Sequence, residues 1–399
     1  MILSIIIKMI KISLRGNSIY IIQLFIYYYL RRIDSTIIKR IFNFQDSLIF
    51  TLLMHFGEFF GGLASYIYQN TFLKTKKKLE KNKNNINSRL IIYKKKEMSR
   101  VDGKFKIYLL IFFAAFFDFI EYAIMNFFVQ KLAKLSPTSD IRLTSITTIS
   151  SSLIFVYALK LRIGKHQFYS LLIIGICLFI TLIVEFSIQR KVERFDNLLY
   201  AYLLTMISLI FITFTDTIEK YLTEFNFLNP FIILIIESII GIILVTIYSF
   251  GQNPFLEIKN VYDNDSTGNF ILLIFLLFLY FVFSAGTNVY KLLSNVYYTP
   301  MAKSIAIYIL NPILLIYSYF YENDFQIEGK SNIIYLIVNI ILSIIIGFFG
   351  FVYNEFLVLF CCGLEFETHL VISKRSQFQF ENAVQELKSI INDESFLDE

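Results

Sequence analysis

Tryptophan is absent from this chain of 399 residues, and cysteine and proline are scarce, with three and five copies. Three cysteines are too few for a disulfide framework. Cys177 stands alone, and Cys361 and Cys362 are adjacent, so none has the paired C-x-x-C spacing of a structural zinc site. We therefore expect neither a disulfide scaffold nor a bound metal.

Histidine is equally rare, with His55, His166 and His369 as its only copies. Loops outside the apolar runs contain no paired-carboxylate motif. Little is left for acid–base or metal chemistry, which depends on such groups. We expect a protein that is not an enzyme and that needs no cofactor.

Charged residues make up only 17% of the sequence, whereas 56% of it is hydrophobic and the mean hydropathy is +0.62. Soluble domains carry about 25% charged residues and are far less apolar. The composition predicts an integral, multi-pass membrane protein whose first partner is the lipid bilayer.

Long apolar runs mark the membrane spans, since a helix needs about 20 apolar residues to cross the hydrocarbon core. The sequence predicts nine clear spans: 44–72, 108–135, 137–161, 168–188, one from 203, one from 230, 270–296, 300–319 and 333–360. Residues 1–40 hold a weak first span or an interfacial helix, because the apolar stretch 18–30 is short. About ten helices are expected.

A weak internal repeat divides these spans into two halves. Asn126 is followed by Pro137, and Asn288 by Pro300, each time between two consecutive spans. Two halves of five spans each have opposite orientations in the membrane, which is a transporter design. We predict an all-α polytopic membrane protein of two inverted five-helix repeats, with a first bundle at 41–198, a second at 199–363 and a cytoplasmic tail at 364–399.

Lysine and arginine are concentrated in the linker 73–107. Loops rich in these residues stay in the cytoplasm, so this linker sets the predicted topology. Its flanking spans argue against nucleic acid as a partner, and attraction to anionic lipid is a secondary prediction.

Residues 202–241 contain two apolar runs that meet at a polar elbow, predicted at 216–229. Asp216, Glu219 and Lys220 are interpreted as a solvated helix end, because charges near a terminus can extend to the membrane surface. Glu237 lies inside the following span, where a carboxylate is costly unless it faces protein or water. It is a functional-site hypothesis, and a simple hydrogen bond to a neighbouring helix is the alternative.

A second carboxylate, Glu58, lies inside the run 44–72. His55 precedes it by three residues, on the same helix face, and is its expected partner. A structural hydrogen bond is favoured over a proton relay. In the same run, Gly57, Gly61 and Gly62 predict close packing on a neighbouring helix.

Hydroxyl side chains are dense after Pro137, as would suit the wall of a polar cavity. Serine and threonine also bond to their own helix backbone, and this alternative stays open. The predicted cavity residues are Glu58, Asp118, Glu121, Asn126, Thr144, Ser145, Thr148, Ser151, Glu237, Asn288 and Asn311.

Four stretches resemble the drug/metabolite transporter superfamily, and within it the solute carrier 35 group that includes nucleotide-sugar transporters. They are FNFQDSLIFTLLMHFGEFF at 42–60, the segment 125–178 that begins MNFFVQKLAKLSPTSD, DTIEKYLTEFNFLNPFIILIIESIIG at 216–241, and YNEFLVLFCCGLEFETHLVISKRS at 353–376. The resemblance covers residues 40–375 in pattern rather than in a single signature.

This resemblance implies ten spans in two inverted halves, cytosolic termini, a central cavity and alternating access. The helices after Pro137 and Pro300 would flank that cavity. The chain departs from the family in its weak first span. It also has no mid-span basic pair for a sugar nucleotide, since Lys131 and Lys291 stand toward predicted span ends. The substrate class therefore stays open.

We expect a secondary transporter that moves a small polar or organic solute, either nucleotide-sugar-like or another metabolite. Its carboxylates would bind a cationic group or couple transport to protons. The alternative is a non-transporting membrane receptor or scaffold. A homodimer stays open, and the resemblance favours an endomembrane, Golgi or endoplasmic reticulum, over the plasma membrane.

Overall fold

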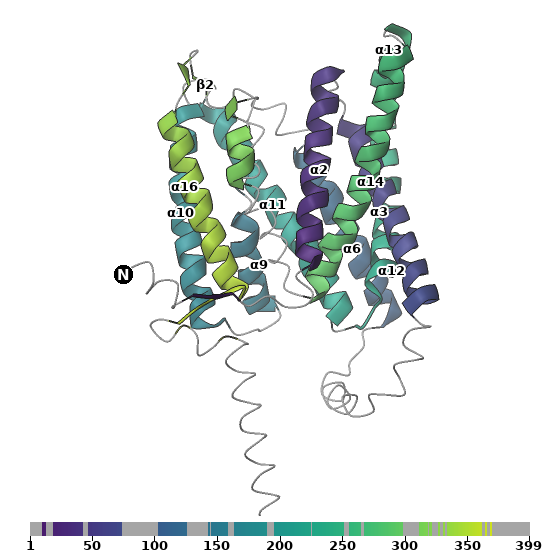
Figure 1. The fold of residues 1–399 in the computed structure, drawn as a ribbon. Coiled ribbons are helices and arrows are strands. Elements are labelled where there is room, and N and C mark those ends of the chain that lie inside the picture. Colours follow the sequence, from purple (N-terminus) through teal and green to yellow (C-terminus); the bar gives the residue numbers. More distant parts are fainter. Residues whose placement is uncertain are drawn as a thin grey trace, which may run out of the picture.

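A computed structural model of the chain is shown in Figure 1. It describes residues 10–12, 19–42, 47–73, 103–125, 143, 145–158, 163–189, 195–224, 226–250, 255–264, 267–297, 311–317, 319–320, 326–327, 330–331, 333–360, 364 and 368. Most of the predicted linker 73–107 and of the tail 364–399 lies outside these residues.

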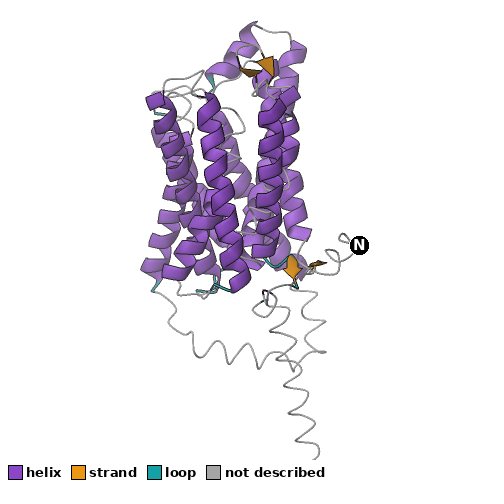
Figure 2. Ribbon diagram, turned by 90° about the vertical axis from the view of Figure 1, so that its left-hand side faces the viewer, coloured by secondary structure: helices purple, strands orange, loops and turns teal. Residues whose placement is uncertain are grey.

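Helices make up nearly all of the described chain, and they run roughly parallel (Figure 2). They are α2 (Ile19–Ile41), α3 (Ser47–Tyr68) with its π-helical extension η2 (Gln69–Leu73), α6 (Lys104–Ala123), α9 (Ser145–Ala158), α10 (Lys165–Gln189), α11 (Phe195–Glu224), α12 (Pro230–Tyr248), α13 (Leu256–Asn264), α14 (Thr267–Tyr297) and α16 (Ile333–Tyr353). Residues 311–317 are also helical.

Two short strand pairs lie at opposite ends of the bundle (Figure 2). At one end β1 (Ile10–Ile12) pairs antiparallel with β4 (Leu357–Leu359), with Ile10 opposite Leu359. At the other end β2 (Gln326–Ile327) pairs with β3 (Lys330–Ser331). The first pair ties the beginning of the described chain to the segment that follows α16.

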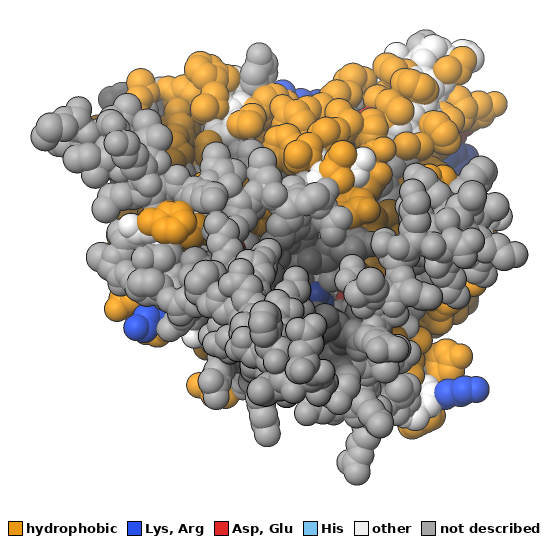
Figure 3. Space-filling model, turned by 60° about the horizontal axis from the view of Figure 1, so that its bottom comes forward, with side chains coloured by type: hydrophobic (Ala, Val, Ile, Leu, Met, Phe, Trp, Pro, Cys, Tyr) orange, Lys and Arg blue, Asp and Glu red, His pale blue; other side chains and the backbone are white. Residues whose placement is uncertain are grey.

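Six of the described helices are long and apolar enough to cross a membrane. They are Leu48–Thr71, Lys165–Val184, Asp196–Thr223, Pro230–Tyr248, Thr267–Val296 and Ile333–Tyr353. Large apolar side chains are exposed on these helices, and described apolar side chains gather along the upper part of the view in Figure 3. Exposed apolar bands of this kind need a lipid environment, so the prediction of an all-α integral membrane protein is confirmed.

The number of membrane spans, about ten, and their division into an inverted repeat remain predictions. The helix α6 has the length of a span, but Lys104, Lys106, Asp118 and Glu121 interrupt its apolar sequence. The helix α9 has only 14 residues. The remaining predicted runs continue into residues that the structure does not describe.

The N-terminal helix α2 extends well beyond the apolar stretch predicted at 18–30. It packs lengthwise on α14, where the rings of Tyr27 and Tyr290 stack with centroids 5.5 Å apart. Gly286 of α14 provides the space for the Tyr27 ring. Of the two predicted alternatives, this packing favours a member of the bundle over a helix that lies flat on the membrane.

The helices form two groups with α11 between them (Figure 1). On one side α10 packs on α9 and α16, and on the other α3 packs on α12 and α14. The helix α11 contacts α9 in the first group and α6 in the second. Each group therefore combines helices from both predicted halves of the sequence.

Close contact between α3 and α14 depends on glycine. A Cβ atom at Gly57 would lie 2.8 Å from the carbonyl oxygen of Phe281 and 2.9 Å from the amide nitrogen of Ala285. A Cβ atom at Gly61 would lie 3.1 Å from the carbonyl oxygen of Ala285. The predicted close packing at these glycines is confirmed.

Replacing Gly57 by alanine tests this contact. Because the added Cβ meets backbone atoms, which cannot rotate away, we expect Gly57→Ala to destabilise the bundle by about 1–3 kcal/mol. Gly175→Ala is the matched control, since a Cβ there meets only Ile149 at 3.9 Å. Thermal unfolding of the purified variants should show a lower melting temperature for Gly57→Ala alone. Equal shifts in both variants would contradict the close contact.

Candidate functional site

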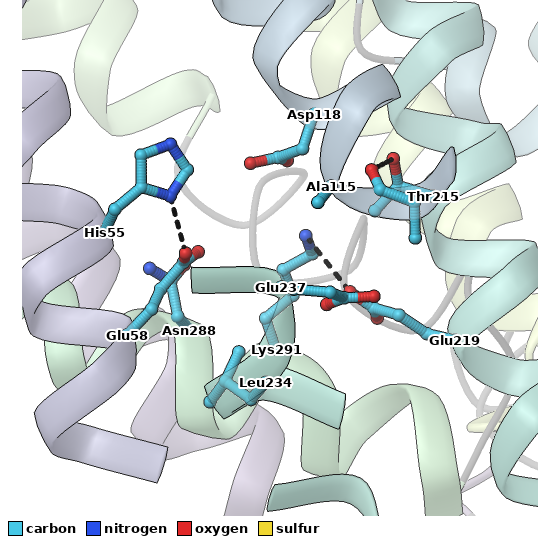
Figure 4. A pocket seen from close by; sticks show the side chains of 11 residues that line it. His55, Glu58, Ala115, Asp118, Thr215, Glu219, Leu234, Glu237, Asn288 and Lys291 are labelled. Atoms are coloured by element: carbon cyan, nitrogen blue, oxygen red, sulfur yellow. Dashed lines mark hydrogen bonds and ion pairs between the residues drawn. The ribbon is translucent and has the colours of Figure 1, made fainter. Parts of the chain in front are cut away.

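A pocket lies where α11 meets four helices of the group that contains α3, namely α3, α6, α12 and α14 (Figure 4). Each helix contributes at least one polar side chain to it. The lining residues are His55 and Glu58 of α3, Ala114, Ala115 and Asp118 of α6, Thr215 and Glu219 of α11, Leu234 and Glu237 of α12, and Asn288 and Lys291 of α14.

The predicted solvated elbow is wrong. The helix α11 continues to Glu224, and Asp216, Glu219 and Lys220 are buried, with 1%, 3% and 7% of their surface exposed. The chain turns only after this helix, and Asn229 then caps α12 through its side-chain oxygen, which accepts from the amide of Phe231. The charges stay inside the bundle because α14 supplies their partners.

Lys291 is the main partner of the two carboxylates on α11. Its Nζ lies 3.6 Å from Oδ1 of Asp216 and 3.8 Å from Oε1 of Glu219. Asn295, one turn further along α14, donates from Nδ2 to Oε2 of Glu219 at 2.7 Å. Lys291 stands toward the end of α14, as predicted, and its long side chain reaches the pocket that α11 and α14 share.

Lys220 also contacts α14. Its Nζ donates to the carbonyl oxygen of Val296 at 3.0 Å, near the end of α14. This bond places a positive charge at the C-terminal end of a helix, where the helix dipole favours it.

His55 and Glu58 pair as predicted, through Nδ1 and Oε2 at 2.9 Å. The imidazole ring lies over Gly241 of α12, where an added Cβ would come within 2.6 Å of the ring. Only 2% of His55 is exposed, and its Nε2 atom has no hydrogen-bond partner among the described residues. Glycine at 241 thus creates the space that brings this histidine to the pocket.

Glu237 and Asn288 are buried on the pocket wall, and both were predicted cavity residues. Oε1 of Glu237 and Nδ2 of Asn288 have no hydrogen-bond partner within the described part of the chain. Buried polar atoms without a partner are costly, and in native structures they are explained by a bound group or by strain. Two such atoms in one pocket indicate that the pocket accommodates a polar ligand or water.

Negative charge exceeds positive charge around the pocket. Five carboxylates, on Glu58, Asp118, Asp216, Glu219 and Glu237, are gathered there, against the two ammonium groups of Lys220 and Lys291. With His55 neutral, the formal sum for these side chains is three negative charges. Such an excess is unfavourable in a low-dielectric bundle unless protons or another cation offset it.

The pocket is small in the conformation shown. The volume in which the centre of a water molecule fits is about 10 Å³, which is close to what one water needs. In this conformation the pocket has room for one water or a small ion.

The predicted hydroxyl wall does not reach this pocket. Ser145, Thr148 and Ser151 are buried in the other helix group, on α9. Nearby hydroxyls bond to their own helix, as Ser152 Oγ does to the carbonyl oxygen of Thr148 at 2.6 Å. Ser150 also bonds to Thr213 of α11 at 3.0 Å. The alternative of backbone and interhelical bonds thus describes α9 better than a cavity wall at this pocket.

Other predicted residues fall elsewhere. Glu121 lies on α6 one turn beyond Asp118 and does not line the pocket, and Asn311 is buried at the start of the helical stretch 311–317. Asn126 and Thr144 lie outside the described residues. The structure brings together Glu58, Asp118, Glu237 and Asn288 from the predicted set.

Four polar pocket residues were missing from the predicted cavity set, namely His55, Thr215, Glu219 and Lys291, although His55 was predicted as the partner of Glu58. A signal existed for the lysine, since Asn288 and Lys291 are three residues apart and share a helix face. For Glu219 there was no such signal, because Asp216, Lys220 and Glu224 make the sequence around it polar.

No protein-family model matches this chain, and no curated protein is significantly similar to it. The chemistry of the pocket residues is therefore the evidence on function.

Removing the positive charge at Lys291 should unfold the site. We expect Lys291→Met to cost about 3–5 kcal/mol, because two buried carboxylates lose their cationic partner. Adding Glu219→Gln to this variant should recover part of the loss, since it removes one of the two carboxylate charges that Lys291 offset. Thermal unfolding of the purified proteins measures both effects, with Lys259→Met on the exposed surface of α13 as the control. A loss no greater than in the control would contradict the pairing.

Proposed function

We propose that this protein is a secondary transporter that moves a small, positively charged solute through the membrane by alternating access. The observation that carries the proposal is the pocket, in which Glu58, Asp118 and Glu237 converge from three helices inside the bundle. Ionisable side chains inside a membrane bundle are expensive and mark solute or ion pathways.

The helix arrangement we propose goes beyond the six apolar spans. With α2, α6, α9 and the segment around 311–320, the chain would have about ten helices in two inverted five-helix repeats, as the resemblance to the solute carrier 35 group implies. Support comes from the mixing of helices from both halves around the pocket, where α3 and α6 meet α11, α12 and α14. Transporters of this design bind their solute at the interface of the repeats.

The proposed access change involves α11, which lies between the two helix groups. Its carboxylates at 216 and 219 are joined to α14 by Lys291. A cationic solute bound nearby competes with Lys291 for the same negative charges. Binding and release can thereby change the contact between α11 and α14, which is the differential interaction that a two-state transporter requires.

The proposed partners are the lipid bilayer and a small-molecule or ionic solute. An endomembrane location, in the Golgi or the endoplasmic reticulum, is proposed from the resemblance alone. A receptor or scaffold has less support, because it gives no reason for polar atoms that are buried in a pocket without a hydrogen-bond partner among the described residues.

The test is solute uptake into proteoliposomes that contain the purified full-length chain. The panel consists of labelled nucleotide sugars, amino acids, organic cations and metal ions. We expect saturable uptake of a cationic class, reduced at least about tenfold in Glu237→Gln, because the variant removes a buried carboxyl group from the pocket. Asp263→Asn is the control, since it removes an exposed carboxylate on α13.

Two results would count against the proposal. Equal uptake by Glu237→Gln and Asp263→Asn would place the solute path elsewhere. A folded protein with no uptake of any compound would favour the receptor or scaffold alternative.

A further inference from the structure

We infer that the pocket binds a divalent transition-metal cation, such as Mn²⁺, Fe²⁺ or Zn²⁺, through His55, Glu58 and Asp118, and that this ion is the transported solute. The second part rests on the proposed transport function. The first part rests on the pocket alone and can be tested without transport.

The geometry of the three side chains fits a metal. One ligand atom from each of His55, Glu58 and Asp118 can be chosen so that all three lie within 4.8 Å of one another. Ligands bound to one ion at about 2.1 Å are roughly 3.5 Å apart. A small inward movement of these side chains would therefore complete the site. Asp118 comes from α6 and faces the two α3 side chains across the pocket (Figure 4).

An independent observation points to a ligand at this place. His55 is 2% exposed and lines the pocket, yet its Nε2 has no partner among the described residues. On the facing α12 wall, Oε1 of buried Glu237 is also without a hydrogen-bond partner in the described part of the chain. An imidazole nitrogen is a common metal ligand, so an ion held with Glu58 and Asp118 would satisfy the His55 nitrogen that is otherwise costly to bury.

The charges favour a doubly charged ion. Lys291 is already held by the carboxylates at 216 and 219 of α11. Glu58, Asp118 and Glu237 therefore remain without a cation of their own apart from the imidazole of His55. An ion with two positive charges offsets most of this excess, and the second carboxylate oxygen of each group can accept hydrogen bonds from bound water.

The size and type of the ligands narrow the class of ion. Space for about one water excludes an organic cation in this conformation, whereas a bare metal ion fits. A ligand set with one imidazole differs from the all-oxygen sets that Mg²⁺ and Ca²⁺ prefer, and no thiolate lines the pocket to select Cu(I). Three protein ligands also leave coordination positions open, as exchange of a transported ion requires.

The site is tested first by Co²⁺ binding to the purified full-length protein, after metal removal with a chelator. Co²⁺ bound by nitrogen and oxygen ligands gives visible d–d absorption, a readout independent of transport. We expect one Co²⁺ per chain. His55→Gln and Asp118→Asn should each weaken binding at least about 10–100-fold.

His166→Gln is the matched control. His166 is also a buried histidine, 3% exposed, with Nε2 3.5 Å from a carboxylate oxygen of Glu355, but it lies at the start of α10 and away from the pocket. Its loss should leave Co²⁺ binding unchanged. Thermal unfolding of each variant without metal shows whether it is folded, and Asp118→Asn keeps the test valid if His55→Gln unfolds.

The outcomes separate this inference from the proposed function. Absent Co²⁺ absorption, or equal absorption in His55→Gln and His166→Gln, overturns the metal site even if proteoliposomes take up an organic cation. Uptake driven by a proton gradient without metal binding also overturns it and assigns the pocket to protons.

Co²⁺ binding lost only in the pocket variants supports the site, and uptake of ⁵⁴Mn²⁺ or ⁶⁵Zn²⁺ lost in the same variants supports the ion as the solute. Metal binding without metal uptake overturns the assignment of the ion as solute.

Discussion

The ion pairs of Lys291 with Asp216 and Glu219 allow charged residues inside an otherwise apolar bundle. Without a cation nearby, a helix with two carboxylates in this region would have to end at the membrane surface. With it, α11 continues to Glu224 and stays buried between the two helix groups. The same pairs join α11 to α14, together with the bonds from Asn295 to Glu219 and from Lys220 to Val296.

The pocket exists beside these pairs because small side chains leave room for large polar ones. Gly241 provides the space for the His55 ring, and Ala114 and Ala115 form part of the wall opposite. The carbonyl oxygen of Ala114 accepts a bond of 3.1 Å from Thr215, which holds α6 against α11. Close helix packing and a polar cavity thus come from the same choice of small residues.

The serine- and threonine-rich helix α9 shows why polar residues in a span need not line a cavity. A hydroxyl in a helix can donate to the carbonyl four residues earlier, and Thr181, Thr205 and Thr213 also do so, at 2.8–3.0 Å. Such a bond satisfies the hydroxyl without any ligand. The helix backbone cannot satisfy every polar atom of a carboxylate or an imidazole in this way. Such side chains are therefore a better guide to the pocket than hydroxyls are.

The sequence by itself determined the local features. Apolar runs predict membrane helices because hydropathy and length are properties of one segment, and the spacing of His55 and Glu58 or of Gly57 and Gly61 predicts a shared face because a helix repeats every 3.6 residues. Only the tertiary structure decided that Asp118, Glu219 and Lys291 meet Glu58 and Glu237. That meeting depends on how five helices are ordered and rotated around one another, and no local period of the chain contains this information.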